Sequence, residues 1–262
     1  MPSRSGPQAR APGDDADRHR LPRAIAARLA RAGRIDAMPV ADAGAEAANS
    51  PPRLKAPAPA DHWSREVFEL IEWRRFEAVV EALFAQAGFE TRSQPHGADG
   101  GVDIWLYSVN HADGDAPVSI VQCKQWMRWR VGVKEVRELR GVMAQHGIAR
   151  GQFVTTSDFT DDAREFAAGN GIGLHDVDGL LRLIGTRDPE QQDALLRVAF
   201  EGEWWRPTCA SCGIKLVERT ARQSGRLFWG CENFVRGCKT QMPMRHWCRE
   251  GAEHSRRCCP EK

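Results

Sequence analysis

The chain has 262 residues, 42% of them hydrophobic and 27% charged, and its formal net charge is +2. This length allows one medium domain and one small one, because domains commonly run to about 100–200 residues. No apolar run approaches the roughly 20 residues that cross a bilayer, and the N-terminus lacks the apolar stretch of a secretory signal. We therefore expect a cytoplasmic protein with no membrane partner.

Residues 1–61 are rich in Ala, Arg and Pro, and include the run Ala56-Pro57-Ala58-Pro59. This composition predicts a disordered segment that ends in a stiff linker. A short helix over 25–32 fits the pattern, and a misassigned start codon would give the same composition.

From residue 62 the pattern becomes that of a globular domain, which we place at residues 62–188. Ser64 is positioned to cap one long helix, whose apolar residues recur at helical spacing until Gly88 ends it. The elements predicted after it are strands over 89–92, 102–107 and 118–124, a helix over 134–145, a strand over 151–156, a helix capped by Thr160, a strand over 172–175 and a helix over 179–184.

The resulting order predicts an α/β fold with a mixed sheet flanked by helices, because each β-α-β crossover makes two strands parallel. The strands over 102–107 and 118–124 are expected to form a hairpin. A connector follows at 189–206, with a helix over 189–205. A small cysteine-containing module is placed at 207–245, and a basic tail at 246–262.

Three polar residues on the predicted hairpin form a candidate active site. Asp103 follows two glycines on one strand, while Gln122 and Lys124 are two residues apart on the other and share a face. Carboxylate and amide oxygens, with the Cys123 carbonyl, are ligands that Mg²⁺ accepts, and an ammonium group can orient water and stabilise charge at a phosphate. Glu77, at the edge of the first helix's apolar stripe, is a further candidate ligand or water holder.

Each of these residues also has a structural interpretation. Asp103 after two glycines fits a turn, and a Gln-x-Lys pair on a strand fits a solvated face. Asp99 fits a turn former, while Thr155 and Thr156 fit the end of a strand. The functional hypothesis depends on the arrangement of these residues together.

Four segments carry a resemblance that covers roughly residues 64–185: Phe76-Glu77, Gly97-Ala98-Asp99-Gly100-Gly101-Val102-Asp103-Ile104, Val121-Gln122-Cys123-Lys124 and Phe153-Val154-Thr155-Thr156-Ser157. Together they resemble the Mrr-type restriction endonucleases of the PD-(D/E)XK superfamily. The resemblance implies a restriction-endonuclease fold and metal-dependent cleavage of double-stranded DNA with Mg²⁺ or Mn²⁺. It further implies that Asp103, Gln122 and Lys124 are catalytic and that Glu77 is an acid supplied by a helix. Several such enzymes act on methylated DNA, which makes modified DNA a candidate substrate.

Seven of the eight cysteines follow residue 208, which indicates metal binding rather than a disulfide framework. Cys209-x-x-Cys212 is followed after 18 residues by Cys231, and after six more by Cys238. Four thiolates in two pairs make the closed tetrahedral site that structural Zn²⁺ prefers. We therefore expect a zinc-ribbon-like module at 207–245.

Charge is distributed unevenly along the chain. Residues 62–203 carry 15 Lys and Arg against 23 Asp and Glu, whereas residues 204–262 carry 12 against 5. The net charges of these two parts are therefore −8 and +7. The C-terminal part is expected to attract a polyanion such as DNA.

The residues around the cysteines, 209–219 and 225–234, resemble the C-terminal zinc fingers of bacterial type I topoisomerases. That resemblance implies binding of single-stranded DNA through an aromatic surface and nearby basic residues. The implied DNA-binding residues are Phe228, Trp229, Phe234, Arg222, Arg226, Arg236 and Lys239. Alternatively, some of the aromatic side chains fill the small core of the module.

The tail contains Cys248, Cys258 and Cys259, with His246 and His254. Exposed unpaired cysteines are one interpretation of this tail, and a second zinc site is the other.

Taken together, the sequence predicts a Mg²⁺-dependent DNA endonuclease with a role in restriction or defence. One site per chain favours a homodimer if both strands are cut. A DNA repair or processing nuclease is the second interpretation, and a catalytically inactive DNA-binding protein of the same fold is the third. The presence of Asp103, Gln122 and Lys124 argues against the third.

Overall fold

The structure is a computed structural model that describes residues 56–93, 102–112 and 114–244. Several predicted features lie outside these ranges. They are the helix over 25–32, most of the Ala/Pro-rich segment, the glycine-rich turn 97–101 with Asp99, and the tail with Cys248, Cys258 and Cys259.

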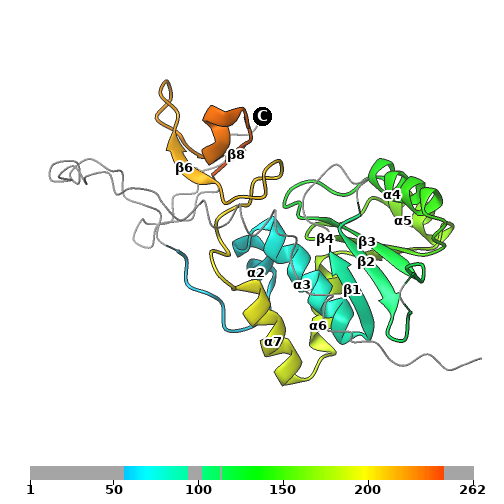
Figure 1. Cartoon of the computed structure of the whole chain (residues 1–262). Coiled ribbons are helices and arrows are strands. Elements are labelled where there is room, and N and C mark those ends of the chain that lie inside the picture. The colour runs from blue at the N-terminus through cyan, green and yellow to red at the C-terminus, as the bar shows by residue number, and fades with distance from the viewer. Residues whose placement is uncertain (1–55, 94–101, 113, 245–262) are drawn as a thin grey trace, which may run out of the picture. The chain divides into compact units, whose positions relative to one another are not determined.

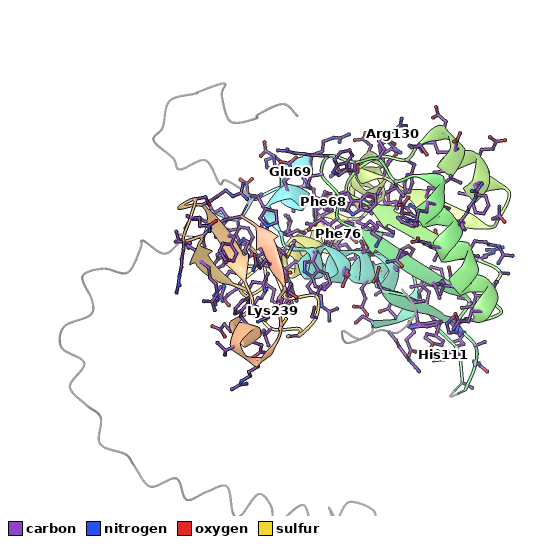
Figure 2. The ribbon with its side chains drawn as sticks, turned by 90° about the horizontal axis from the view of Figure 1, so that it is seen from above. Phe68, Glu69, Phe76, His111, Arg130 and Lys239 are labelled. Atoms are coloured by element: carbon purple, nitrogen blue, oxygen red, sulfur yellow. The ribbon has the colours of Figure 1, made fainter. Side chains whose placement is uncertain are left out.

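The predicted first helix is two helices, α2 (Arg65–Leu70) and α3 (Trp73–Gln86), so the prediction of one continuous helix is wrong. The chain turns extended at Ile71, and the Glu72 N–H donates to the carbonyl of Trp204, 2.7 Å away. The Glu72 N–H therefore donates to a residue far along the chain, whereas in a continuous helix it would donate to the carbonyl four residues earlier. Phe68 of α2 and Phe76 of α3 still pack together, with ring centroids 6.0 Å apart (Figure 2).

The central sheet has five strands in the order β1-β2-β3-β4-β5. Their bounds are Phe89–Ser93 for β1, Ile104–Ser108 for β2, Ser119–Lys124 for β3, Gly151–Thr155 for β4 and Ile172–His175 for β5. Strands β1, β2 and β3 pair antiparallel, whereas β3, β4 and β5 pair parallel. The predicted mixed sheet and the predicted hairpin are both confirmed.

Helices cover both faces of this sheet (Figure 1). On one face, α4 (Val133–Gln145) and α5 (Asp161–Ala168) pack over Ile120 and Phe153. On the other, α2, α3, α6 (Val177–Gly185) and α7 (Pro189–Ala199) pack over Val121 and Cys123. The side chains of β3 alternate between the two cores: Val121 and Cys123 point to one face, whereas Ile120, Gln122 and Lys124 point to the other.

Local capping explains where several helices begin. The Thr160 hydroxyl accepts a hydrogen bond from the Ala163 N–H, as predicted for α5. Asp176 caps α6, which therefore begins earlier than the predicted 179. The connector helix α7 ends at Ala199 rather than at residue 205, and Trp204 beyond it is buried in the core.

The C-terminal module is a three-stranded antiparallel sheet of β6 (Val217–Thr220), β7 (Leu227–Gly230) and β8 (Gln241–Pro243), with a short 3₁₀ helix η1 (Glu232–Arg236). Its small core contains Leu216, Trp229 and the cysteine side chains. Within the described ranges, no helix has both the length and the apolar character to cross a membrane.

Candidate functional site

The carboxylate of Asp103 lies against β3. Its Oδ2 accepts hydrogen bonds from the Cys123 N–H at 2.6 Å and from the Gln122 side-chain amide at 2.5 Å, and its own N–H donates to the Val121 carbonyl at 3.1 Å. Gln122 and Lys124 flank Cys123, which is buried in the opposite core. The structure thus brings Asp103 and Gln122 into direct contact beside Lys124.

The carbonyl of Lys124 accepts three hydrogen bonds at the end of β3. The donors are the Thr155 hydroxyl at 2.8 Å, the Trp126 N–H at 3.0 Å and the Thr156 N–H at 3.3 Å. These bonds fix the backbone from which the Lys124 side chain extends. Among the residues that the structure describes, no hydrogen bond or ion pair holds its ammonium group, although its charge lowers the pKa of Asp103.

Two residues from α3 complete the cluster. Glu77 is close enough for the charge of Asp103 to raise its pKa, and Arg74 lies one helical turn earlier, with its guanidinium 3.2 Å from the Glu77 carboxylate. The Arg74 guanidinium also covers the Trp73 ring at 5.2 Å. Sequence reasoning missed Arg74, although its three-residue spacing from Glu77 is the available signal.

Burial dominates the electrostatics of this cluster. It raises the pKa of Asp103 to about 6, against the opposing effects of the Cys123 N–H, Lys124 and Arg74. Burial and the charge of Asp103 raise the pKa of Glu77 to about 8, which the ion pair with Arg74 does not offset. At neutral pH, Glu77 therefore stays mainly protonated beside an ionised Asp103 unless a further cation is present.

These pKa shifts predict that, without divalent ions, the protein loses stability as pH rises from 5 to 8. The folded state holds the proton of Glu77 up to about pH 8, whereas the unfolded state releases it near the ordinary glutamate pKa of 4.5. The stability that this proton contributes is fully present below the pKa of Glu77 in the unfolded state. It is lost as pH rises through the pKa of Glu77 in the folded state. We expect a fall of about 2 kcal/mol or more in the free energy of unfolding, measured by urea unfolding in a buffer without Mg²⁺ or Mn²⁺ and without a chelator.

Glu77→Gln is the matched variant for this pH dependence, because it removes the titrating group and keeps the size of the side chain. Its free energy of unfolding is expected to fall less over the same range. Equal slopes for the two proteins would contradict the assignment of the pH dependence to Glu77.

The four predicted zinc ligands cluster in the C-terminal module. The Sγ atoms of Cys209, Cys212, Cys231 and Cys238 all lie within 4.8 Å of one another. Two of the separations are 3.7 Å (Cys209 to Cys238) and 3.9 Å (Cys212 to Cys231). A tetrahedral site with Zn–S bonds of about 2.3 Å requires separations of about 3.8 Å. The thiols thus have the spacing of a zinc site and are too far apart for disulfides.

The surface of the module presents only some of the predicted DNA-binding side chains. Trp229 is buried among the cysteines, so its ring is not available to stack on a base. Phe228 is half-buried and Phe234 is 41% exposed, with the Lys239 ammonium 3.8 Å from the centre of the Phe234 ring. The three predicted arginines, Arg222, Arg226 and Arg236, are exposed.

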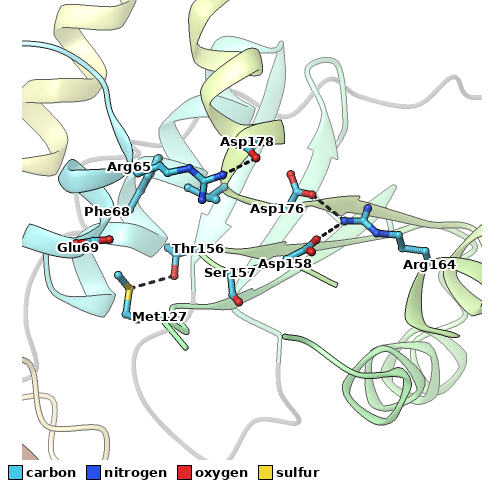
Figure 3. Close-up of a pocket in the computed structure, with 11 residues that line it drawn as sticks. Arg65, Phe68, Glu69, Met127, Thr156, Ser157, Asp158, Arg164, Asp176 and Asp178 are labelled. Atoms are coloured by element: carbon cyan, nitrogen blue, oxygen red, sulfur yellow. Dashed lines mark hydrogen bonds and ion pairs between the residues drawn. The ribbon is translucent and has the colours of Figure 1, made fainter. Parts of the chain in front are cut away.

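A cavity of about 550 Å³ lies near the end of β4 and the start of α6 (Figure 3). Its two arginines are already paired: Arg65 with Asp178 at 2.5 Å, and Arg164 with Asp158 and with Asp176, the latter at 3.0 Å. Asp103, Gln122 and Lys124 do not line it. The candidate active site is therefore distinct from this cavity.

Comparison with known proteins identifies the domain that carries the candidate active site. Residues 68–184 match the family model of the Mrr catalytic domain, described as a restriction endonuclease. EcoKMrr of Escherichia coli K12, a type IV methyl-directed restriction enzyme, is 37% identical over 130 residues, which cover 47% of this chain and 41% of that enzyme. An uncharacterized Sinorhizobium fredii protein, y4cE, is 30% identical over 103 residues, covering 39% of this chain and 26% of that protein.

Two solved structures are also similar. The DNA modification-dependent restriction endonuclease AspBHI is 24% identical, with a TM-score of 0.39 over 56% of this chain and 43% of that one. The MspJI restriction endonuclease in complex with a 27-mer oligonucleotide is 21% identical, with a TM-score of 0.36 over 51% of this chain and 33% of that one.

Residues 68–184 thus match an Mrr-type catalytic domain of the restriction-endonuclease family. This part of the chain is similar in sequence to part of EcoKMrr. The chain spans less than half the length of the curated relatives it matches.

Proposed function

We propose that the protein is a DNA endonuclease that hydrolyses phosphodiester bonds with Mg²⁺ or Mn²⁺. The observation that carries this proposal is the Asp103 carboxylate, held between the Cys123 N–H and the Gln122 amide beside Lys124, within an Mrr-type domain. A bound divalent ion would contact a phosphate oxygen and lower the pKa of the attacking water.

The residues present fit such an ion. The Asp103 carboxylate, the Gln122 amide and the Cys123 carbonyl converge, because the Gln122 amide nitrogen lies 2.5 Å from Asp103 and 3.5 Å from the Cys123 oxygen. A flip of the Gln122 side-chain amide exchanges its nitrogen and oxygen, so that the oxygen would face the proposed ion. A cation there would also relieve the repulsion between Asp103 and Glu77.

The proposed roles of the residues follow from their charges. Asp103, with a pKa of about 6, is mostly ionised at neutral pH and supplies the negative ligand. The ammonium of Lys124 orients the attacking water and neutralises the charge that develops on the phosphate. Glu77, paired with Arg74, holds a second water or ligand position from the helix side.

We further propose that the module at 207–245 binds Zn²⁺ through its four cysteines and grips DNA. Phe228 and Phe234 supply rings for stacking, and the exposed arginines with Lys239 contact phosphates. The burial of Trp229 removes that residue from the proposed DNA surface.

Restriction of foreign DNA is the proposed biological role, and methylated DNA is the leading substrate, because the relative EcoKMrr is a methyl-directed restriction enzyme. Cleavage of both strands would need two copies of the chain, which makes a homodimer part of the proposal.

A cleavage screen tests this function. Methylated, unmethylated, branched and single-stranded DNA of one sequence are incubated with the full chain and Mg²⁺ or Mn²⁺. We expect metal-dependent cleavage that prefers methylated duplex. Preference for branched DNA would favour a repair or processing nuclease, and binding without cleavage of any substrate would favour a catalytically inactive DNA-binding protein.

A further inference from the structure

Glu72 is a buried acid that the mechanism above does not use. Its side chain is 1% exposed, yet its carboxylate accepts four hydrogen bonds. One comes from the Arg74 N–H in the first turn of α3, at 3.2 Å. The other three come from the C-terminal part of the chain: the Thr208 N–H, the Thr208 hydroxyl and the Lys215 ammonium, each at 3.0 Å.

The two distant partners of Glu72 belong to the first cysteine knuckle. Thr208 precedes Cys209, Lys215 follows Cys212 by three residues, and Thr208 and Lys215 pair in a short antiparallel bridge. This pairing places the hydrogen-bond donors of Thr208 and Lys215 side by side, on either side of the two cysteines of the knuckle. Trp73 adds a further bond, since its indole N–H donates to the Thr208 carbonyl at 2.8 Å.

The ammonium of Lys215 is saturated by this arrangement. Besides Glu72, it donates to the carbonyl of Glu203 at 3.0 Å and to that of Arg206 at 2.9 Å. These three bonds use all three of its protons. Glu72 is the buried partner, so removing the Lys215 charge leaves its carboxylate buried without a counter-charge.

We propose that Glu72 is a positioning residue, through which the first cysteine knuckle (residues 208–215) fixes the start of α3 and so holds Arg74 and Glu77 at the candidate active site. The proposal rests on the nuclease function proposed above. Arg74 and Glu77 lie in the first turns of α3, where a helix frays most easily when its cap is lost. In this proposal the cysteine module supports the active site structurally, in addition to binding DNA.

This role predicts an effect on turnover rather than on affinity. Lys215→Met keeps the aliphatic length of the side chain and removes the ammonium group that pairs with Glu72. It is expected to lower kcat about ten-fold or more, with KM changed by about two-fold or less. Glu72→Gln should act in the same way, Thr208→Val more weakly, and Lys215→Arg should recover part of the loss. Lys134→Met, on the exposed face of α4, is the matched control that removes a lysine charge away from α3.

Two measurements on the full chain test the proposal: kcat and KM from cleavage rates over a series of methylated DNA concentrations, and amide hydrogen exchange of the α3 peptides without DNA. In Lys215→Met, exchange at the start of α3 should rise about ten-fold or more, while the sheet strands stay protected. Unchanged α3 exchange in both Lys215→Met and Glu72→Gln would overturn the proposal, and so would faster exchange with unchanged kcat.

The exchange measurement separates this proposal from the proposed function. If the wild-type chain cleaves no DNA, the nuclease function fails, and α3 exchange still decides whether the knuckle fixes the helix. If Lys215→Met loses protection throughout the domain, the milder Thr208→Val decides, because it removes only one hydroxyl hydrogen bond.

Discussion

Replacement of Lys124 by Met, or of Asp103 by Asn, is expected to lower the single-turnover rate of DNA cleavage about 1,000-fold or more, which is about 4 kcal/mol in the barrier. Lys124→Met removes the only cation that β3 supplies to the cluster. Asp103→Asn removes the charge of the metal ligand but retains an oxygen that can accept the Cys123 N–H. Cleavage is measured with Mg²⁺ at an enzyme concentration that saturates the DNA.

The control variants make the same two substitutions, Lys to Met and Asp to Asn, at exposed positions outside the cluster. Lys134→Met and Asp193→Asn change exposed residues on α4 and α7 and should cleave at the wild-type rate. DNA affinity, measured in Ca²⁺, should stay within about three-fold for all four proteins, because much of DNA affinity comes from contacts with phosphates along the groove. Cleavage that persists within about ten-fold in both site variants would refute the assignment of the active site.

The sequence predicts much of this cluster because its geometry is local. Strand alternation alone places Gln122 and Lys124 on one face, and the hairpin alone brings Asp103 across from them. In the structure the Asp103 carboxylate does contact the Gln122 amide. The catalytic roles of these residues are the predictions that the Lys124 and Asp103 variants test.

Features that depend on distant partners could not be predicted in the same way. The break between α2 and α3 follows from Glu72, whose partners Thr208 and Lys215 lie more than 130 residues further along the chain. No local pattern signals that contact, because Glu is an ordinary helix residue. The sequence likewise leaves open whether Trp229 lies on the surface or in the core; in the structure its strand β7 pairs with β8 and its ring packs among the cysteines.

Removal of zinc is expected to unfold the C-terminal module and to lower DNA affinity about ten-fold or more at about 0.1 M salt. Apart from cysteines, the buried side chains of the hydrophobic module core are Leu216 and Trp229, with partly buried Ile214, Met242 and Met244 around them. Such a core is too small to fold alone, and structural zinc contributes about 10–16 kcal/mol in comparable small domains. Metal analysis should find one zinc per chain, and Cys231→Ser or a zinc-selective chelator should abolish protection of β6 and β7 in hydrogen exchange.

A double variant, Arg222→Gln with Arg226→Gln, separates the charge of the module from its fold. It should keep the zinc and the protection of β6 and β7, yet reduce the slope of log affinity against log salt by about 2, because each phosphate contact contributes about 0.9. Zinc removal should instead weaken binding and also disorder the surface that presents Phe228 and Phe234. A purified protein without zinc whose module keeps its exchange protection would show that the four thiols do not form a metal site. Unchanged affinity after zinc removal would show that the module does not grip DNA.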